Sequence, residues 1–279
     1  MGSVTTFGID AWACLRPGVY TCLAEPDAVT IGCVLGDDHT LLVDTGSSPD
    51  QGAELAASVR DQLGRTVDVA VVTHGHTDHW FGLAGLPGVA SWGHVALQRE
   101  AHDCVDAQVA YEYGFSPELI VPPANLVAAE AWIDLGERRV ELICCGPAHS
   151  NTDLIVAVPD ADLIFMGDLI EEAGDPCFGA DCTPSRWVAA IRHALICAGP
   201  DTLLVPGHGV PVRPDFAEAQ AEALRALCRR IGALWRSGIR LPDALNSLDV
   251  PAEVPWPFEL GTVRKALVLA YAELGKRPD

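Results

Sequence analysis

The sequence predicts an α/β fold, and three observations lead to that prediction. Short apolar runs rich in β-branched residues alternate with stretches of helical periodicity along most of the chain. Residues 67–73 form a continuous apolar run, which is typical of a strand covered on both faces. The chain also repeats itself loosely: predicted strands end near Asp44 and His74 in the first half, and near Asp168 and His208 in the second. We therefore expect a pseudo-symmetric pair of sheets with one site at their shared rim.

The first half begins with a predicted hairpin. Residues 28–35 and 40–44 have strand composition, and the turn-forming residues 36–38 join them. A helix is predicted over 49–63, with Ser48 as its N-cap and Gly64 as its end. The strand over 67–73 follows. Residues 98–127 resemble an addition to the fold, for which we expect a helix and a loop lying over the surface.

Four more strands are predicted in the second half, over 140–143, 154–158, 163–166 and 203–205. Between the last two, Thr183 and Pro184 open a helix that ends before Gly199. The tail has a long amphipathic helix over 216–234, a proline-rich linker over 250–257 and a last helix over about 262–274. We expect residues 1–214 to form the catalytic domain, and residues 215–279 to be a helical extension packed on it.

The charge of the chain excludes some partners. It has 38 acidic and 18 basic residues and a net charge of −20, which repels phosphate backbones and anionic lipids. Nucleic acids and membranes are therefore not expected partners. The ten cysteines form no CxxC pair, and the N-terminus lacks the pattern of a signal peptide. We expect a cytoplasmic protein with reduced thiols.

The most specific motif is the run from His74 through His76 and Asp78 to His79, directly after the apolar strand over 67–73. Three imidazoles and a carboxylate packed into one turn would be costly to desolvate without a counter-charge, and a divalent cation would supply it. Imidazole and carboxylate together suit zinc and other first-row metals. Three further candidates stand just past predicted strands, namely His149, Asp168 and His208. The sequence therefore predicts a metal site. His39, His94, His102 and His193 stand outside this pattern.

With these residues, the sequence resembles the metallo-β-lactamase superfamily over roughly residues 19–212. The resemblance implies a four-layer αββα sandwich of two mixed sheets between helices. It implies that His74, His76 and His149 bind a first metal ion, and that a second is bound by Asp78, His79 and His208. Asp168 matches the carboxylate that bridges the two ions, and Asp44 matches an acid that orients a histidine ligand.

The function implied is a dinuclear zinc hydrolase, in which a hydroxide bridging two Zn²⁺ ions attacks a small ester, thioester, lactone or amide. Asp78 is the expected catalytic residue, because it can orient the hydroxide or move its proton. Iron or manganese would also suit these ligands. The partner expected is a small-molecule substrate. The sequence leaves open whether the tail helices complete the pocket or form a homodimer surface.

Two alternatives stay open, a mononuclear iron enzyme similar to persulfide dioxygenases and a true β-lactamase. The sequence departs from the β-lactamase pattern at two positions. Lactamases with the nearest ligand pattern carry a cysteine at the position of Asp168 and a substrate-binding lysine at the position of Glu171. An acid there would repel an anionic substrate. Cys177 and Cys182 are expected to be buried thiols. Six aromatic residues suggest an apolar acyl pocket: Trp80, Phe81, Tyr111, Tyr113, Phe115 and Phe178.

Overall fold

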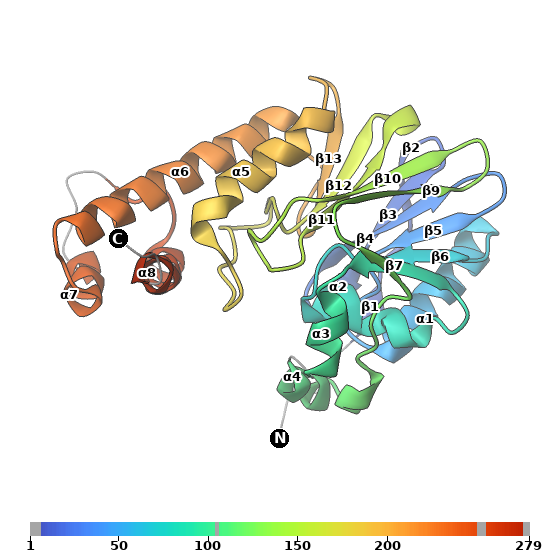
Figure 1. The fold of residues 1–279 in the computed structure, drawn as a ribbon. Coiled ribbons are helices and arrows are strands. Elements are labelled where there is room, and N and C mark those ends of the chain that lie inside the picture. Colours follow the sequence, from blue (N-terminus) through green and yellow to red (C-terminus); the bar gives the residue numbers. More distant parts are fainter. Residues whose placement is uncertain (1–6, 104–105, 250–254, 276–279) are drawn as a thin grey trace.

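Two β-sheets face each other and carry helices on their outer faces, so that the chain forms the four-layer αββα arrangement expected from its sequence (Figure 1). The computed structural model describes residues 7–103, 106–249 and 255–275. Most of the predicted 250–257 linker lies outside the described residues. In the described part, no helix has both the length and the apolar composition that crossing a membrane requires.

The first sheet comes from the N-terminal half. Its strands follow the order β1-β3-β4-β5-β6-β7-β8, and β2 pairs with β3. Strands β3, β4 and β5 pair antiparallel, and β5, β6, β7 and β8 pair parallel. The strands are β1 (Gly8–Ile9), β2 (Ala13–Arg16), β3 (Val19–Glu25), β4 (Val29–Leu35), β5 (Thr40–Val43), β6 (Val69–Val71), β7 (Ala90–His94) and β8 (Asn125–Val127).

The second sheet has the order β13-β12-β11-β10-β9. Its strands pair antiparallel except for β12 and β13, which run parallel. They are β9 (Glu130–Asp134), β10 (Arg139–Cys144), β11 (Leu154–Val158), β12 (Leu163–Gly167) and β13 (Leu203–Pro206). The parallel ends of β5 and β6 in one sheet, and of β12 and β13 in the other, are the ends that carry the predicted site residues.

Side-chain alternation in the strands explains why the sheets stack. In β4, Ile31 and Cys33 pack toward the helices of the first sheet, whereas Val34 belongs to the cluster between the sheets. Gly32 faces the second sheet, where an added Cβ would lie 2.4 Å from the ring of Phe165. Glycine at this position therefore lets the two sheets approach closely.

The helices over the first sheet are mostly short. In α1 (Pro49–Ser58) the Ser48 side chain accepts a hydrogen bond from the Gln51 amide, and a π-helical turn (Val59–Leu63) leads to Gly64 in left-handed conformation. The prediction for 49–63 is confirmed. The other helical segments of this half are α2 (Thr77–Trp80), a 3₁₀ turn (Phe81–Gly85), α3 (Leu97–His102), α4 (Ala107–Glu112) and a 3₁₀ turn (Pro117–Leu119).

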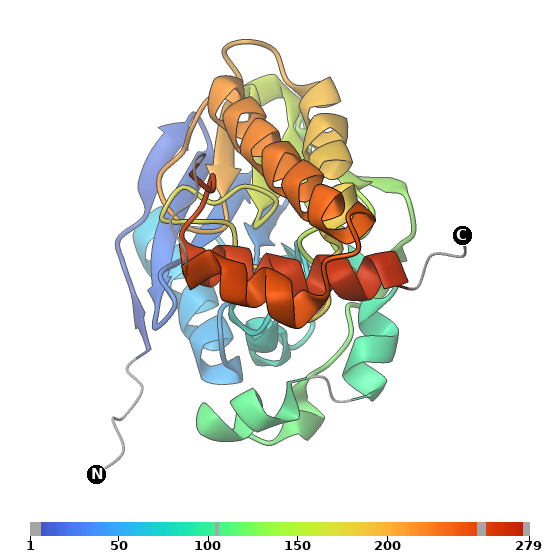
Figure 2. The same ribbon diagram turned by 90° about the vertical axis from the view of Figure 1, so that its left-hand side faces the viewer.

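The described part of the second half has four α-helices, of which the first two lie on the outer face of the second sheet and the last two lie farther out, away from the strands (Figure 1). They are α5 (Pro184–Ala194), α6 (Pro214–Arg236), α7 (Leu241–Asn246) and α8 (Leu260–Gly275). Short 3₁₀ turns stand at Pro159–Ala161, Leu195–Cys197 and Ser247–Asp249. Figure 2 shows α6 and α8 crossing over the same side of the molecule. One core cluster contains Ile164 of β12, Trp187 of α5, Leu224 of α6 and Leu267 of α8, and so joins residues on both sides of the predicted boundary at 214.

Some elements differ from the sequence prediction. Strands β1 to β3, β7 and β9 and helix α7 were not expected, and the addition over 98–127 contains strand β8 besides its helices. The strands β1, β2 and β8 have two to four residues, so a period of two is hard to recognise in them, whereas the seven-residue β3 was missed despite its length. The nine cysteines in the described part of the chain are free thiols.

Candidate metal centre

The predicted ligands come together at one rim of the two sheets. His74 follows β6, and Asp168 and His208 follow β12 and β13. His149 lies on the loop between β10 and β11, while His76, Asp78 and His79 lie at the start of α2. The carboxyl ends of strands from both sheets thus supply side chains to one small volume.

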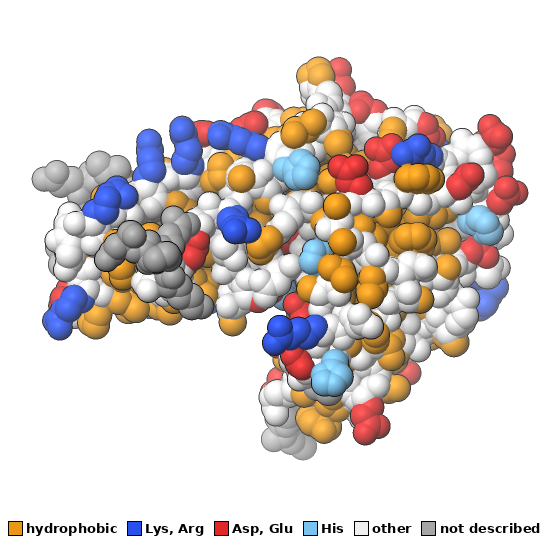
Figure 3. Space-filling model, in the orientation of Figure 1, with side chains coloured by type: hydrophobic (Ala, Val, Ile, Leu, Met, Phe, Trp, Pro, Cys, Tyr) orange, Lys and Arg blue, Asp and Glu red, His pale blue; other side chains and the backbone are white. Residues whose placement is uncertain are grey.

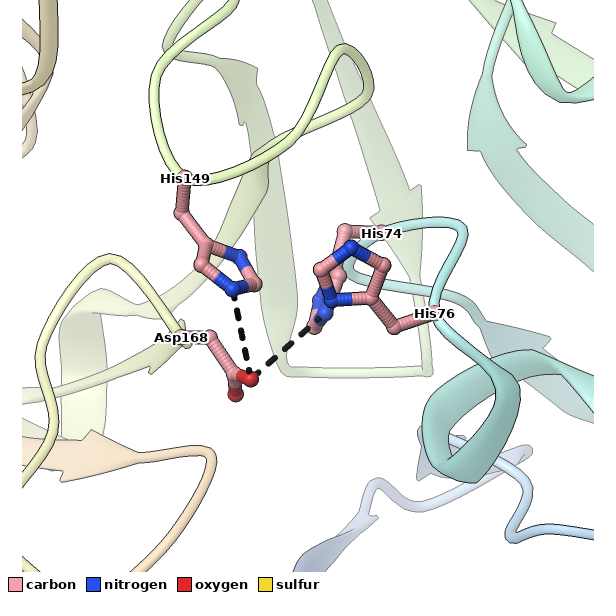
Figure 4. A group of neighbouring side chains, drawn as sticks. All are labelled: His74, His76, His149 and Asp168. Atoms are coloured by element: carbon pink, nitrogen blue, oxygen red, sulfur yellow. Dashed lines mark ion pairs between the residues drawn. The ribbon is translucent and has the colours of Figure 1, made fainter. Parts of the chain in front are cut away.

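The first group comprises His74, His76, His149 and Asp168, whose ligand atoms all lie within 4.8 Å of one another. Figure 4 shows their side chains converging from three loops. The Nε2 atoms of His74 and His149 are each 3.7 Å from Asp168 Oδ2. His74 and His149 are completely or almost completely buried, so this group lies deep in the protein.

The second group comprises Asp78, His79 and His208. Asp78 Oδ2 lies 3.1 Å from His208 Nε2 and 3.4 Å from His79 Nε2. The carboxylate of Asp168 also reaches this group, with Oδ1 at 3.2 Å from His79 Nε2 and Oδ2 at 3.6 Å from His208 Nε2. Asp168 therefore lies between the two groups and contacts both.

Four of the five histidines have one ring nitrogen occupied by another group of the protein. His74 Nδ1 is 3.1 Å from Thr73 Oγ1, and His79 Nδ1 is 2.8 Å from Asp44 Oδ2. His76 Nε2 is 3.2 Å from Asp181 Oδ1, and His208 Nδ1 is 3.0 Å from the Asp27 carbonyl oxygen. Such contacts fix the orientation of an imidazole and leave its other nitrogen for a metal ion.

Five buried polar atoms of the cluster have no hydrogen-bond partner among the described residues. His74 Nε2, His79 Nε2, both ring nitrogens of His149 and Asp168 Oδ1 are buried without a hydrogen bond in the described structure. Unpaired buried polar atoms are costly, and in native proteins a bound water or ion usually accounts for them. The orphaned atoms converge and are nitrogen and oxygen donors, so the residues present fit metal ions of the zinc type.

Charges in the cluster shift its pKa values in opposite directions. Burial, followed by the neighbouring His79, lowers the pKa of His74 well below its usual value. Although burial lowers it, the carboxylates of Asp78, Asp168 and Asp44 together raise the pKa of His79 well above that value. Although burial acts in the opposite direction, His79 and His74 hold the pKa of Asp168 well below its usual range. Perturbations of this size are typical of functional sites.

Two glycines make room for the cluster. A Cβ on Gly207 would lie 1.8 Å from Asp168 Oδ1, so only glycine lets the central carboxylate occupy its position. A Cβ on Gly75 would lie 2.4 Å from Glu100 Oε2, while the Gly75 amide donates to Thr152 Oγ1 at 2.8 Å. Close approach to neighbouring side chains, rather than a strained turn, thus explains glycine between His74 and His76.

A cavity of about 550 Å³ opens beside the second group. Figure 3 shows the surface hollowed between the C-terminal helices and the lobe with α3 and α4. Asp106 and Val109 line the cavity from that lobe, and residues 173–177 line it from the opposite segment. Six carboxylates line it and, among the described residues, no lysine or arginine does; the acids are Asp27, Asp78, Asp106, Asp168, Glu171 and Asp175.

Two expectations about this pocket are wrong. None of the six aromatic residues lines the cavity: Trp80, Phe81 and Phe178 are buried in core clusters, and Tyr111 is 65 % exposed. Trp80, Phe81, Phe115 and Phe178 pack in the apolar clusters beneath the helices instead. Cys177, expected to be buried, is exposed and lines the cavity, whereas Cys182 is buried as expected.

Sequence reasoning missed Asp181, which contacts His76, and it missed the role of the Asp27 backbone. Asp181 is 105 residues away from His76 in sequence, and it stands in a loop with no recognisable motif. Asp44 was expected to orient a histidine, and it contacts His79. His39, His94, His102 and His193 belong to none of the candidate metal groups.

Comparison with known proteins agrees with this geometry. The family model described as the metallo-beta-lactamase superfamily matches residues 24–229. The chain belongs to this superfamily. A metallo-beta-lactamase type 2 from Bacillus cereus is 24 % identical over 211 residues, which cover 74 % of this chain and 76 % of the relative. A hydroxyacylglutathione hydrolase from Ruegeria pomeroyi is 24 % identical over 213 residues, covering 71 % and 75 % of the two chains.

The fold of the superfamily is also found among solved structures. The metallo-beta-lactamase FIM-1 from Pseudomonas aeruginosa, in its mono-zinc form, superposes with a TM-score of 0.63 at 20 % identity. The match covers 77 % of this chain and 95 % of FIM-1. At this identity the similarity establishes the fold, and the chemistry must be argued from the residues of the site.

Proposed function

We propose that this superfamily member is a metal-dependent hydrolase with two metal positions, which cleaves a small neutral or cationic ester, thioester, lactone or amide. One observation carries the proposal: seven side chains of suitable chemistry converge at one rim, and several of their donor atoms are buried without a partner. We propose zinc for both positions, with iron or manganese as alternatives. The relatives named as hydrolases and the FIM-1 mono-zinc form support the reaction class and the metal.

His74, His76 and His149 would hold the first ion and Asp78, His79 and His208 the second, with Asp168 between them. Bound cations would supply Lewis acidity here, polarising a carbonyl and making water acidic enough to ionise near neutral pH. This chemistry needs no serine or cysteine nucleophile.

The protein's own residues would orient the reactants. Asp78 lines the cavity and stands 3.1 Å from His208, so its carboxylate can accept a hydrogen bond from water or move a proton. Asp44 holds His79 and Asp181 holds His76, and each thereby fixes the ring nitrogen left for the metal. We therefore assign Asp78 the catalytic role and the other two acids positioning roles.

The charge of the cavity favours the neutral or cationic class of substrate. Its lining has six carboxylates and no described lysine or arginine, so an anion would gain no ion pair on entering. Glu171 stands where a substrate-binding lysine would be needed for a lactam carboxylate. Despite the similarity to lactamases, we therefore place β-lactams below uncharged esters and thioesters as substrates.

The remaining sequence expectations stay predictions: a cytoplasmic location, a division into residues 1–214 and 215–279, and a homodimer as one use of the tail helices. The core cluster shared by β12, α5, α6 and α8 supports a tail packed on the catalytic domain.

Metal quantification on purified protein, followed by a hydrolysis panel, tests the proposal. The panel compares an aryl ester, a thioester, a lactone, a β-lactam and a phosphodiester. We expect two zinc ions per chain and acyl-ester or thioester cleavage that chelation abolishes. His74→Ala and Asp78→Ala should abolish turnover without unfolding the chain, and His193→Ala, an exposed histidine of α5, serves as control. Metal-free protein that retained its full rate would refute the proposal, and one iron with oxygen consumption would favour the dioxygenase alternative.

A further inference from the structure

Glu171 lies beside the candidate metal centre, although neither metal group described above includes it. Its carboxylate, Asp168 and His208 have ligand atoms within 4.8 Å of one another. Glu171 also lines the cavity, so it faces the same volume as Asp78 and His208. The second position therefore has a further carboxylate within reach.

The backbone around Glu171 is held by helices of the second half. The Glu171 amide donates to Gln220 Oε1 of α6 at 3.0 Å. The preceding turn is fixed at the Leu169 carbonyl, which accepts hydrogen bonds at 3.0 Å from Gln220 Nε2 and from Trp187 Nε1 of α5. These contacts direct the Glu171 side chain inward, toward the cluster, instead of leaving it on a free surface loop.

The Glu171 carboxyl group faces the cavity and has no hydrogen-bond partner among the described residues. Glu171 is only 7 % exposed, and its carboxylate accepts no hydrogen bond from the described part of the chain. The adjacent Glu172 differs, because its Oε2 accepts a hydrogen bond from the Val210 amide at 2.9 Å. A carboxyl group in such a place can stay neutral by keeping its proton, and a cation bound on its cavity side would instead stabilise the ionised form.

We infer that Glu171 is an additional ligand of the second metal position, and that it makes this position more suited to harder cations than the first. The inference rests on the proposed function, since it concerns the same centre. The group Asp168, Glu171 and His208 shares His208 with the group Asp78, His79 and His208, so the two together bring three carboxylates and two imidazoles to this side of the centre. The first position has three imidazoles and Asp168. Carboxylate-rich sites suit manganese and related hard ions, and imidazole-rich sites suit zinc. The structure thus indicates two positions with different metal preferences.

Metal binding to the full chain tests this inference without any substrate. Metal-free wild-type protein and the Glu171→Gln variant are titrated with Zn²⁺. In a second experiment, both receive one equivalent of Zn²⁺ and are then titrated with Mn²⁺. The bound ions per chain are counted after dialysis. In Glu171→Gln the first ion should bind as in wild type. The second should bind at least ~10-fold more weakly, with a larger loss for Mn²⁺ than for Zn²⁺.

Two matched controls separate coordination from general electrostatics. Asp175→Asn removes one negative charge from the same cavity, and Glu172→Gln changes the adjacent acid. Both should leave the second ion bound within a factor of ~3 of wild type. Thermal unfolding of the metal-free proteins checks that Glu171→Gln folds. If the variant does not fold, Mn²⁺ binding to zinc-loaded wild-type protein still decides the metal preference. This binding is measured from the electron spin resonance signal of free Mn²⁺.

The outcomes distinguish this inference from the proposed function. Unchanged binding of the second ion to Glu171→Gln, or an equal loss in Asp175→Asn, would overturn the role of Glu171 while leaving the two-metal centre in place. Failure of zinc-loaded wild type to bind Mn²⁺ would overturn the difference in preference. Wild-type protein that binds no ion at all would overturn both proposals.

Discussion

The two candidate metal positions share one rim, and they differ in depth and in chemistry. The first is formed largely by imidazoles, and His74 and His149 are completely or almost completely buried. The second has more carboxylate character, and its Asp78 and His208 face a cavity of about 550 Å³. Loops at the ends of similar sheets can therefore supply two kinds of position. One is suited to holding an ion permanently, and the other is suited to contact with a substrate.

The two positions also differ in the charge state of their histidines. In the first, burial lowers the pKa of His74 well below its usual value, so this imidazole is already neutral and able to bind a metal, whereas Asp181 outweighs burial and raises the pKa of His76. In the second, burial is outweighed by Asp78 and other carboxylates, which raise the pKa of His79 well above the usual value and that of His208 to about 9. A metal ion entering the second position must therefore displace protons.

Gly207→Ala is expected to have the largest effect, because it would break both positions together. The added Cβ would fall 1.8 Å from Asp168 Oδ1 and displace the carboxylate that the two groups share. We expect affinity for both ions to fall more than ~100-fold, measured by dialysis against a chelator of known affinity. Gly174→Ala is the matched control, because it lines the same cavity and its Cβ would meet nothing within 4 Å. Normal metal binding by Gly207→Ala would contradict the central place of Asp168.

Asp44→Asn and Asp181→Asn should affect the positions separately. Asp44 Oδ2 accepts from both Thr73 Oγ1 and His79 Nδ1, so an amide NH₂ there would force the wrong tautomer on His79 and weaken the second ion by about 10- to 100-fold. Asparagine tolerates the left-handed backbone of Asp44, where φ is 65°. Asp181 is more exposed, and an asparagine oxygen could still accept from His76, so the first ion should weaken less than ~10-fold. Equal effects on both ions in either variant would argue against two separate positions.

Acidification should produce the mildest difference between the positions. Histidines must be neutral to bind metal, and the raised pKa values of His79 and His208 keep them protonated in the metal-free chain to higher pH than His74. As the pH falls from about 8 to about 6, zinc affinity at the second position should decrease by up to roughly tenfold per pH unit for each proton displaced. The first position should also lose affinity, because Asp181 outweighs burial and raises the pKa of His76, but the lowered pKa of His74 should make this loss smaller. Competition with a chelator at each pH measures the zinc affinity of both positions. Equal slopes of affinity against pH at the two positions would contradict the electrostatic difference between them.

Much of the fold was predictable because its signals are local. Ser48 and Gly64 bracket the α1 segment as capping chemistry requires, and the apolar run over 67–73 includes the buried strand β6. Short edge strands such as β1 and β8 carry two and three residues, too few for a period of two to be recognised. Tertiary pairing, rather than local preference, stabilises them.

The candidate site was predictable to a similar degree. Four of the ligands are close in sequence, namely His74, His76, Asp78 and His79. Asp168 and His208 follow β12 and β13, and because these strands are parallel neighbours, their ends lie at the same rim. The cavity lining was predicted wrongly, because aromatic residues near the ligands in sequence pack into the two apolar clusters beneath the rim instead. Residue type alone did not indicate which side chains would turn toward the cavity.

By itself, the sequence determined the alternation of helices and strands and the imidazole and carboxylate donors, since these depend on spacing along the chain and on strand ends; the αββα arrangement followed from the family resemblance that these donors carry. Only the tertiary structure decided that Asp181 holds His76, that Glu171 turns inward beneath α6, and that acids rather than aromatic rings line the cavity. The reason is physical. The direction of a loop side chain is set by contacts with segments distant in sequence, and those contacts exist only after the sheets and their covering helices have packed together.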